Sequence, residues 1–368
     1  QRFTSRVYRR YNDFVSFHEL LLCRFPYRLI PNLPPKKIGV VFSVDAQFLE
    51  NRRKGLLRWL TFFSRHPVIS NDALFHFFLT QTVPDLHLKI KEVFKNVPDE
   101  FSTSEMAAKA KEFVLPNTPN EFAASREQIR VIQSGVGKVK QIADLFAIRS
   151  RSYAADMAEL GVQLCELSAE DGGNSVWATG GNDTWARTKK GLGIISKEFP
   201  LLSRKALEQA LKEENEVCEK LTMLLEVLNG HQELCERVEK GVSHDHQSAL
   251  SKMLSLKKRQ IQDVLRGTDA ESIAVLENRM LQQESVIASV ELRTAFSFYC
   301  VRMETHLVHT YLETLAQVFN SLVSVQITTH KEVRKSYFSS LIDCTSLSSI
   351  QNFNHFGSET SKSFCSQL

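Results

Sequence analysis

The sequence predicts an α+β domain followed by an elongated all-α domain built from three long helices. Residues 1–81 are rich in aromatic side chains and interrupted by prolines, which is typical of the short elements of a small mixed fold. From about residue 122 the apolar positions alternate in steps of three and four, the spacing of coiled-coil helices. A length of 368 residues, with 43% hydrophobic and 24% charged side chains, is sufficient for two folded domains.

Composition excludes several classes of protein. The net charge of +4 is too small for binding nucleic acid by bulk electrostatics, so an anionic partner must meet local clusters of cations. Apolar stretches such as 56–63 end well short of the roughly 18 residues of a membrane-spanning helix. The seven Cys are an odd number without a CxxC spacing, which predicts reduced thiols and neither a disulfide framework, a metal nor a cofactor. The first residues lack the apolar core of a signal peptide, so we expect a cytoplasmic protein.

The first domain should contain the end of a strand and three helices. Residues 7–11 are predicted to be the strand end, and Asn12 or Asp13 is a suitable cap for a helix that Pro26 terminates. A second helix should follow Asp45 and end near His66, and a third should span 74–79. The buried positions recur at helical spacing: Phe14, Phe17, Leu21 and Phe25 in the first helix, and Phe48, Leu49, Leu56, Leu60 and Phe63 in the second.

The long helices follow from the apolar periodicity. The first, at 122–167, carries the heptad positions Ile129, Ile132, Val136, Val139, Ala143, Phe146, Tyr153, Met157, Leu160, Leu164 and Leu167. After a Gly-rich break at 171–183, the second should span 184–266 with a kink near Pro200, and its face is marked by Leu207, Leu211, Val217, Leu221, Leu224 and Leu228. A Gly267-Thr268 turn, with Thr268 and Glu271 as a capping box, should lead into the third helix, which runs to about residue 335. Residues 336–368 lack an apolar period and are predicted to be a flexible tail.

Three short motifs in the first domain suggest an anion site. Arg9-Arg10-Tyr11 lies at the predicted strand-to-helix junction, where a guanidinium and a helix N-terminus together suit a phosphate. Leu33-Pro34-Pro35-Lys36 presents a cation on a rigid loop. The second helix places Arg52 or Arg53 on its apolar side, and spacing leaves the choice between them open.

The order of these motifs resembles the phox-homology (PX) domain of sorting nexins, over residues 1–81 and without two strands that begin the family's fold. The resemblance implies that Arg10 holds the 3-phosphate of phosphatidylinositol 3-phosphate and that Tyr11 packs under the inositol ring. It implies that Lys36 meets the 1-phosphate and that Arg52 hydrogen-bonds the ring hydroxyls.

Residues 121–335 resemble the BAR domain that follows PX in one class of sorting nexins, a curved three-helix coiled-coil dimer. Homodimers, and complexes with other sorting nexins, are the protein partners that this resemblance implies. A basic cluster precedes the predicted turn between the second and third helices and should face an anionic membrane: Lys252, Lys257, Lys258, Arg259 and Arg266, against the single acid Asp263. Within the linker at 82–120, residues 105–114 form either an amphipathic wedge or a short helix packed on its neighbour.

No catalytic motif is complete. His87-Leu88-Lys89 begins a phospholipase D pattern, but Phe94 stands where its Asp should be, and Gly135-Val136-Gly137 lies inside a heptad helix rather than after a strand. We therefore expect a non-enzymatic, peripheral protein of the cytosolic face of early endosomes that binds phosphatidylinositol 3-phosphate and senses or induces curvature in retrograde transport. The alternative is a coiled-coil tether or scaffold without lipid specificity.

Overall fold

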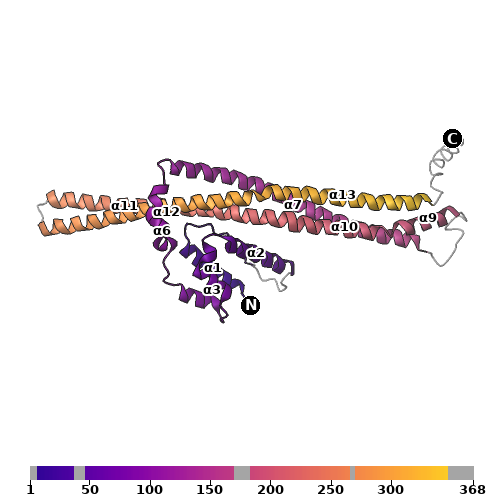
Figure 1. The fold of residues 1–368 in the computed structure, drawn as a ribbon, viewed down its shortest axis with the longest axis horizontal. Coiled ribbons are helices and arrows are strands. Elements are labelled where there is room, and N and C mark those ends of the chain that lie inside the picture. The colour runs from indigo at the N-terminus through magenta and orange to yellow at the C-terminus, as the bar shows by residue number, and fades with distance from the viewer. Residues whose placement is uncertain (1–5, 37–45, 170–182, 266–269, 347–368) are drawn as a thin grey trace, which may run out of the picture. The chain divides into compact units, whose positions relative to one another are not determined.

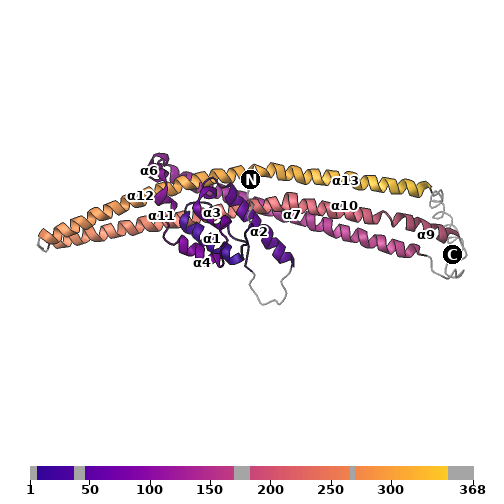
Figure 2. The same cartoon turned by 60° about the horizontal axis from the view of Figure 1, so that its bottom comes forward.

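The computed structural model describes residues 6–36, 46–169, 183–265 and 270–346. It divides into two compact units, one formed by 1–136 with 223–313 and the other by 137–222 with 314–368. Each unit therefore combines segments that are far apart in the sequence (Figures 1 and 2). Helices α7 (Thr118–Ser168) and α11 (Glu219–Leu265) contribute residues to both units.

The N-terminal part of the first unit is a small helical core. It contains α1 (Tyr11–Arg24), α2 (Ala46–Arg65), a 3-10 turn at Ile69–Asn71 and α3 (Ala73–Thr80). Phe17 of α1 stacks on Phe78 of α3, with 4.2 Å between ring centroids, and Trp59 of α2 meets Phe17 edge-on at 5.6 Å. The predicted apolar spacing of the first helix and its end just before Pro26 are confirmed.

Three predictions for this part differ from the structure. The predicted strand end at 7–11 is absent: residues 7–10 have no neighbour among the described segments that shares backbone hydrogen bonds, as a strand needs, and Tyr11 is already helical. Helix α1 begins at Tyr11, so its N-cap is Arg10 rather than Asn12 or Asp13. Leu49 is half exposed, at 50%, whereas Trp59, which was not predicted, is buried. The predicted cap Asp45 lies outside the described residues.

The linker folds back onto a long helix. It contains α4 (Leu86–Val93), α5 (Glu100–Thr103), α6 (Glu105–Lys109) and a 3-10 turn at Ala110–Phe113. Ala107 and Ala110 pack against Phe296 and Cys300 of α12 (Ala270–Leu312). Of the two readings of residues 105–114, the geometry therefore favours the packed linker over a free amphipathic wedge.

The first unit also holds a long helical hairpin. In both views α11 and α12 run side by side towards one end of this unit, and the Gln283 side chain of α12 donates a hydrogen bond to the Ala249 carbonyl of α11 at 2.9 Å (Figures 1 and 2). The predicted turn and capping box at 267–271, and the cation Arg266, lie outside the residues whose side chains the structure describes.

The second unit consists of helices. It contains α9 (Asp183–Ile195), α10 (Phe199–Lys212), a π-helical stretch at Glu213–Cys218 and α13 (Thr314–Ser346), together with the later part of α7. The chain breaks its helix at 196–198, next to Pro200 as predicted, because proline favours the first turn of a new helix. Helix α13 continues to Ser346, past the expected start of the tail at 336.

Burial along the heptads is uneven. Ile129, Val136 and Ala143 of α7 are buried as predicted, whereas Tyr153, Leu160 and Leu167 are exposed. Of the predicted second-helix face, Leu207 and Leu211 are exposed, while Val217, Leu221, Leu224 and Leu228 are buried. Exposed heptad positions are available to another chain, which bears on the function below.

Two glycines of α7 should respond oppositely to alanine. A Cβ at Gly161 would lie 2.8 Å from the Cβ of Phe199, which cannot swing away, whereas a Cβ at Gly135 would meet nothing within 4 Å. Gly135→Ala should raise the free energy of unfolding by up to about 1 kcal/mol, the difference in helix propensity. Gly161→Ala should lower it despite the same propensity gain. Denaturant unfolding of both variants tests this, and equal shifts of one sign would contradict the close approach at Gly161.

Candidate functional site

Arg10 stands at the first turn of α1 with its side chain exposed. Its backbone is extended, with φ −84° and ψ 159°, and its amide donates to Asp13 Oδ2 at 2.7 Å. The helix therefore starts directly after this residue. The Arg10 guanidinium is available to solvent beside a helix N-terminus, where backbone N–H groups and the helix dipole favour an anion.

The neighbouring Arg9 has a structural role. Its Nε and Nη2 donate to the Phe78 carbonyl at 2.8 and 2.5 Å, and Nη2 also donates to the Gln81 carbonyl at 2.8 Å. These bonds satisfy carbonyls at the C-terminus of α3. Burial lowers the pKa of the Arg9 guanidinium, and the nearby Asp13 opposes that effect. Arg9 is thus committed to the fold.

Tyr11, Arg52 and the proline loop meet at one place. The Tyr11 hydroxyl donates to the Pro34 carbonyl at 2.6 Å, and the Arg52 guanidinium lies 4.7 Å from the centre of the Tyr11 ring. Arg52 Nη2 donates to the Pro35 carbonyl at 3.2 Å, while its Nε is buried without a partner among the described residues. The loop approaches α2 closely at Gly55, where a Cβ would lie 3.0 Å from Pro34 Cβ.

The geometry distinguishes the two arginines of α2 that spacing left open. Arg53 is exposed and pairs with Glu50 one turn earlier, Nη2 to Oε1 at 2.7 Å. Arg52 points instead to Tyr11 and also lies 4.5 Å from the centre of the Phe48 ring. Lys36 is exposed and follows Pro35 directly, at the edge of the described loop. The structure thus brings Tyr11, Arg52 and the Lys36 loop together.

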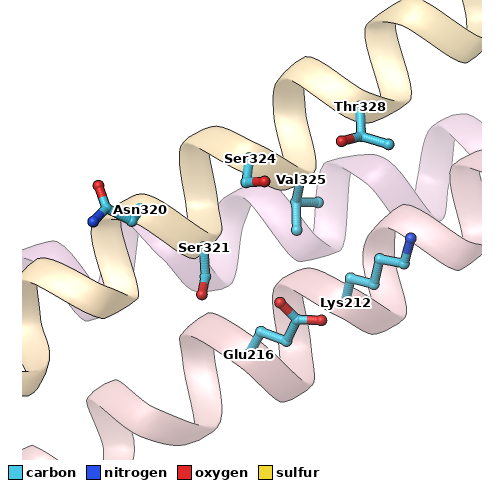
Figure 3. Close-up of a pocket in the computed structure, with 7 residues that line it drawn as sticks. All are labelled: Lys212, Glu216, Asn320, Ser321, Ser324, Val325 and Thr328. Carbon is cyan, nitrogen blue, oxygen red and sulfur yellow. The ribbon is translucent and has the colours of Figure 1, made fainter.

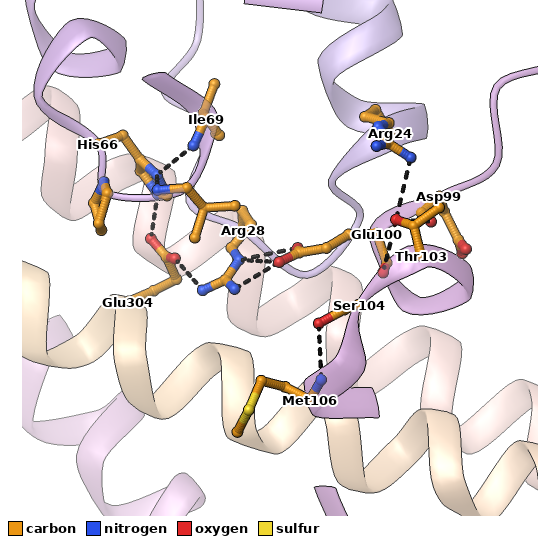
Figure 4. A network of polar contacts seen from close by, with 12 residues as sticks. Arg24, Arg28, His66, Ile69, Asp99, Glu100, Thr103, Ser104, Met106 and Glu304 are labelled. Carbon is orange, nitrogen blue, oxygen red and sulfur yellow. Dashed lines mark hydrogen bonds and ion pairs between the residues drawn. The ribbon is translucent and has the colours of Figure 1, made fainter. Parts of the chain in front are cut away.

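A buried ionic cluster, which the sequence did not predict, holds this part of the chain to α12 (Figure 4). Arg28 donates to both oxygens of Glu100 from the linker, with its Nη2 2.6 Å from Oε1, and its Nη1 donates to Glu304 Oε1 at 3.0 Å. The Arg28, Glu100 and Glu304 side chains are 9% exposed or less. Glu304 could have been noticed in the sequence, because it falls between Val301 and Val308 on the buried face of α12.

His66 completes the cluster as a neutral ring. Its Nδ1 accepts hydrogen bonds from the amides of Val68 and Ile69, both at 3.2 Å, so the proton must be on Nε2. That Nε2 lies 3.1 Å from Glu304 Oε2 and donates to it. Burial alone would raise the pKa of Glu304, but the bonds from His66 and Arg28 outweigh burial and lower it.

Further contacts fix the same unit from other sides. Arg237 of α11 donates to the Pro26 and Arg28 carbonyls at 3.2 and 2.9 Å. Arg58 pairs with Glu226 of α11 at 2.7 Å. These contacts attach the described residues of 6–36 and 46–82, together with the linker, to α11 and α12 within the first unit.

Four of the five predicted membrane-facing cations can be placed. Lys252, Lys257, Lys258 and Arg259 are exposed near the C-terminal end of α11, where Arg259 makes a loose pair of 3.8 Å with Asp263. These cations lie on α11, whereas Arg10 and Tyr11 lie at the start of α1 and Arg52 lies on α2.

A separate cavity of about 410 Å³ lies in the second unit between α10, the π-helical stretch and α13 (Figure 3). It is lined by Lys212, Glu216, Asn320, Ser321, Ser324, Val325 and Thr328, none of which was predicted as a site residue. Within the described ranges, no three His, Cys, Asp or Glu side chains gather as a metal site would require. No described helix has both the length and the apolarity needed to cross a bilayer.

Comparison with known proteins identifies the family. The PX domain family matches residues 1–82. Sorting nexin-8 of Mus musculus is 43% identical over 335 residues, covering 91% of this chain and 72% of the mouse protein, and that of Homo sapiens is 40% identical over the same length. The chain belongs to the sorting nexin family.

As a sorting nexin, the chain also matches a solved structure of the PX-BAR class. The SNX-BAR Mvp1 tetramer, solved by cryo-electron microscopy, gives a TM-score of 0.72 at 21% identity, covering 91% of this chain and 89% of that one. The predicted likeness to PX-BAR sorting nexins is confirmed, and the fold is a PX domain with a helical BAR-like region. Sorting nexins are peripheral membrane proteins of endosomal trafficking.

The buried cluster of this sorting nexin should dominate its stability. Glu304→Ala leaves Arg28 short of a carboxylate in a buried site, and we expect a loss of about 3–5 kcal/mol. The control Glu226→Ala breaks a more exposed pair and should cost at most about 1 kcal/mol. Denaturant unfolding of both variants measures the difference.

The pH dependence of the free energy of unfolding provides a second test of the same cluster. Because the folded-state pKa of Glu304 is depressed, its contribution is present above the ordinary carboxyl value of about 4.3 and is lost as the pH falls through the depressed value. Stability of Glu304→Gln should therefore fall less steeply in acid than that of the parent chain. Parallel acid limbs would show that Glu304 is not ionised in the fold.

Proposed function

We propose that this sorting nexin binds phosphatidylinositol 3-phosphate in a pocket formed by Arg10, Tyr11, Lys36 and Arg52. The observation that carries the proposal is the position of Arg52 against the Tyr11 ring and the Pro35 carbonyl, directly after the exposed Arg10. The PX domain match over residues 1–82 supports a phosphoinositide as the ligand class.

Each side chain suits one part of the headgroup. Arg10 offers the planar fork that pairs with phosphate oxygens, beside the amides of the α1 N-terminus. The Tyr11 ring, held in place by its bond to the Pro34 carbonyl, gives a flat surface for the inositol ring. Arg52, held against the Tyr11 and Phe48 rings, is the group we propose to hydrogen-bond the ring hydroxyls. Lys36 supplies a flexible cation for the 1-phosphate.

The cations of α11 supply a second, less specific attachment. Lys252, Lys257, Lys258 and Arg259 are exposed, and each cation near an anionic leaflet contributes about 1 kcal/mol. We propose that headgroup recognition selects the endosome, that the helical region senses or induces curvature, and that the protein acts in retrograde transport from endosome to Golgi. Two weak contacts on one chain reinforce each other through their high effective concentration.

We also propose that the second unit forms a homodimer. An apolar cavity of about 210 Å³ opens between its helices, lined by Val139, Ile142, Ala143, Phe146, Val217, Leu221, Val318, Phe319 and Leu322. Two of these lining residues, Ile142 and Phe319, are 53% and 43% exposed, and Ile148 and Val323 of the same unit are exposed as well. A contiguous apolar surface of this kind is unusual on a monomer and is covered most simply by the same helices of a second copy. The related Mvp1 structure is a tetramer, which supports self-association.

The alternative function, a coiled-coil tether without lipid specificity, uses the same helices. It gives no reason for Arg10 to be exposed while Arg9, Arg53 and Arg58 are all engaged by protein groups. Equal binding to neutral vesicles and to vesicles with phosphatidylinositol 3-phosphate would favour the tether.

Arg10→Ala should weaken binding to vesicles containing phosphatidylinositol 3-phosphate by about tenfold or more, because charged phosphate bonds are lost. The matched control is Arg53→Ala. It removes an exposed cation of α2, in the same domain, that is already paired with Glu50. Vesicle cosedimentation over a protein titration gives both affinities. An equal loss in the two variants would indicate general charge attraction rather than a pocket.

Replacing the apolar residues of the second unit should separate the chains. Ile142→Glu with Phe319→Glu places charges in the 210 Å³ cavity, and light scattering at micromolar concentration should then give half the mass of the parent. Arg10→Ala is the control and should keep the parent mass, because Arg10 belongs to the other unit. A parent chain that is already monomeric would contradict the dimer.

A further inference from the structure

The last four turns of α11 carry an exposed apolar stripe, formed by Leu250, Leu254, Ile261 and Leu265. Their side chains are 42%, 59%, 60% and 80% exposed. The spacing of four, seven and four residues keeps them on one face of the helix. This face is not the one that packs on α12, since the buried residues here are Ala249 and Met253.

Two lysines interrupt the stripe at its centre. Lys257 and Lys258 follow Leu254 by three and four residues, so they continue the same face between Leu254 and Ile261, and both are exposed. Across the described end of the hairpin, at 250–265 and 274–286, five cations (Lys252, Lys257, Lys258, Arg259, Arg279) stand against three acids (Asp263, Glu277, Glu284). A partner for this surface should therefore be apolar and negatively charged.

The order of the stripe argues against a second copy as that partner. Leu250 and Leu265, and likewise Leu254 and Ile261, are symmetric about the midpoint between Lys257 and Lys258. Two stripes related by a two-fold axis would meet at that midpoint, because each residue contacts its symmetry mate. The four lysines would then lie against each other, and like charges in contact oppose association. Among the helices that the structure describes in the first unit, only α11 and α12 reach this end of the hairpin in the two views (Figures 1 and 2).

We propose that this stripe inserts into the headgroup boundary of an anionic bilayer. The four aliphatic side chains enter the interface, while the lysine stems lie along the apolar surface and their ammonium groups reach lipid phosphates. The proposal rests on the membrane attachment described above and adds to it an apolar anchor at the α11–α12 end. Binding through charge alone is screened by salt, whereas the inserted side chains keep part of their effect.

Depth-sensitive labels test the insertion directly. In a chain with Cys23, Cys165, Cys344 and Cys365 replaced by Ser, an environment-sensitive fluorophore is attached at Ile261→Cys or at Ser255→Cys. Ser255 is exposed and follows Leu254, about 100° round the helix from it, so it is the matched control. With vesicles of phosphatidylcholine and phosphatidylserine, the label at 261 should shift to the blue and be quenched by spin-labelled lipids. The label at 255 should do neither.

The outcomes separate this inference from the proposed function. Vesicle binding with both labels still in water overturns the stripe and leaves membrane attachment standing. Burial of the 261 label without vesicles, increasing with protein concentration, assigns the stripe to a second copy instead. No binding to these vesicles overturns the stripe, whereas the headgroup pocket is overturned separately, by no binding to vesicles that contain phosphatidylinositol 3-phosphate.

A pair of unlabelled variants checks the energetic effect. Leu254→Ser with Ile261→Ser should lower partitioning onto the same vesicles by about tenfold, with the remainder abolished by high salt. Ser255→Ala with Gln262→Ala should leave it unchanged. The thermal unfolding temperature should not move in either pair, because all four side chains are exposed. Unchanged partitioning of the Leu254/Ile261 pair would contradict the anchor.

Discussion

The first unit depends on the buried ion pairs that Arg28 makes with Glu100 and Glu304. A lone charge in this position would cost several kcal/mol, and the chain offsets that cost by giving Arg28 one carboxylate from the linker, Glu100, and another from α12, Glu304. The second carboxylate is itself held by the Nε2 proton of His66. Since every member needs the others, the PX part, the linker and α12 have one arrangement in which all buried charges are met. If only some of these segments docked, a buried charge would remain without its partner.

The hydrogen bonds and ion pairs of the other arginines show which cations remain for a ligand. Arg9 donates hydrogen bonds to carbonyls at the end of α3, and Arg53 pairs with Glu50. Arg58 is engaged by Glu226 of α11. Arg10 and Arg52 remain at the proposed site, one exposed at a helix N-terminus and one lying against the Tyr11 ring. The surplus of donors at this place arises because the fold satisfies the neighbouring arginines elsewhere.

Short-range sequence patterns correctly predicted features that depend on neighbouring residues, such as the buried face and the ends of helices. The spacing of Phe14, Phe17 and Leu21 predicted a buried face of α1, and Pro200 predicted the break before α10. Long-range choices were out of reach: Arg28 and Glu304 are 276 residues apart, and no spacing rule relates them. Residues 7–11 were predicted as a strand end because extended backbone, as at Arg10, is common to strands and helix caps, and only a partner distinguishes the two. Of the proposed site, spacing left Arg52 and Arg53 open and the family resemblance implied Arg52, while the fold shows Arg52 against the Tyr11 ring and Arg53 paired with Glu50.

Rigid docking has a consequence for how such a protein meets a membrane. The proposed headgroup site at Arg10 and the stripe around Ile261 belong to one unit, held together by the Arg28 cluster and by the bonds from Arg237 to backbone carbonyls. A flexible link would let each surface find lipid independently, so neither would report the shape of the bilayer. With the two surfaces fixed, both engage only where the membrane follows the line between them, and elsewhere one contact is lost. If both proposals hold, avidity between the headgroup site and the apolar anchor becomes sensitive to curvature without any change in conformation. Loosening the Arg28 cluster should weaken that sensitivity before it weakens lipid binding itself.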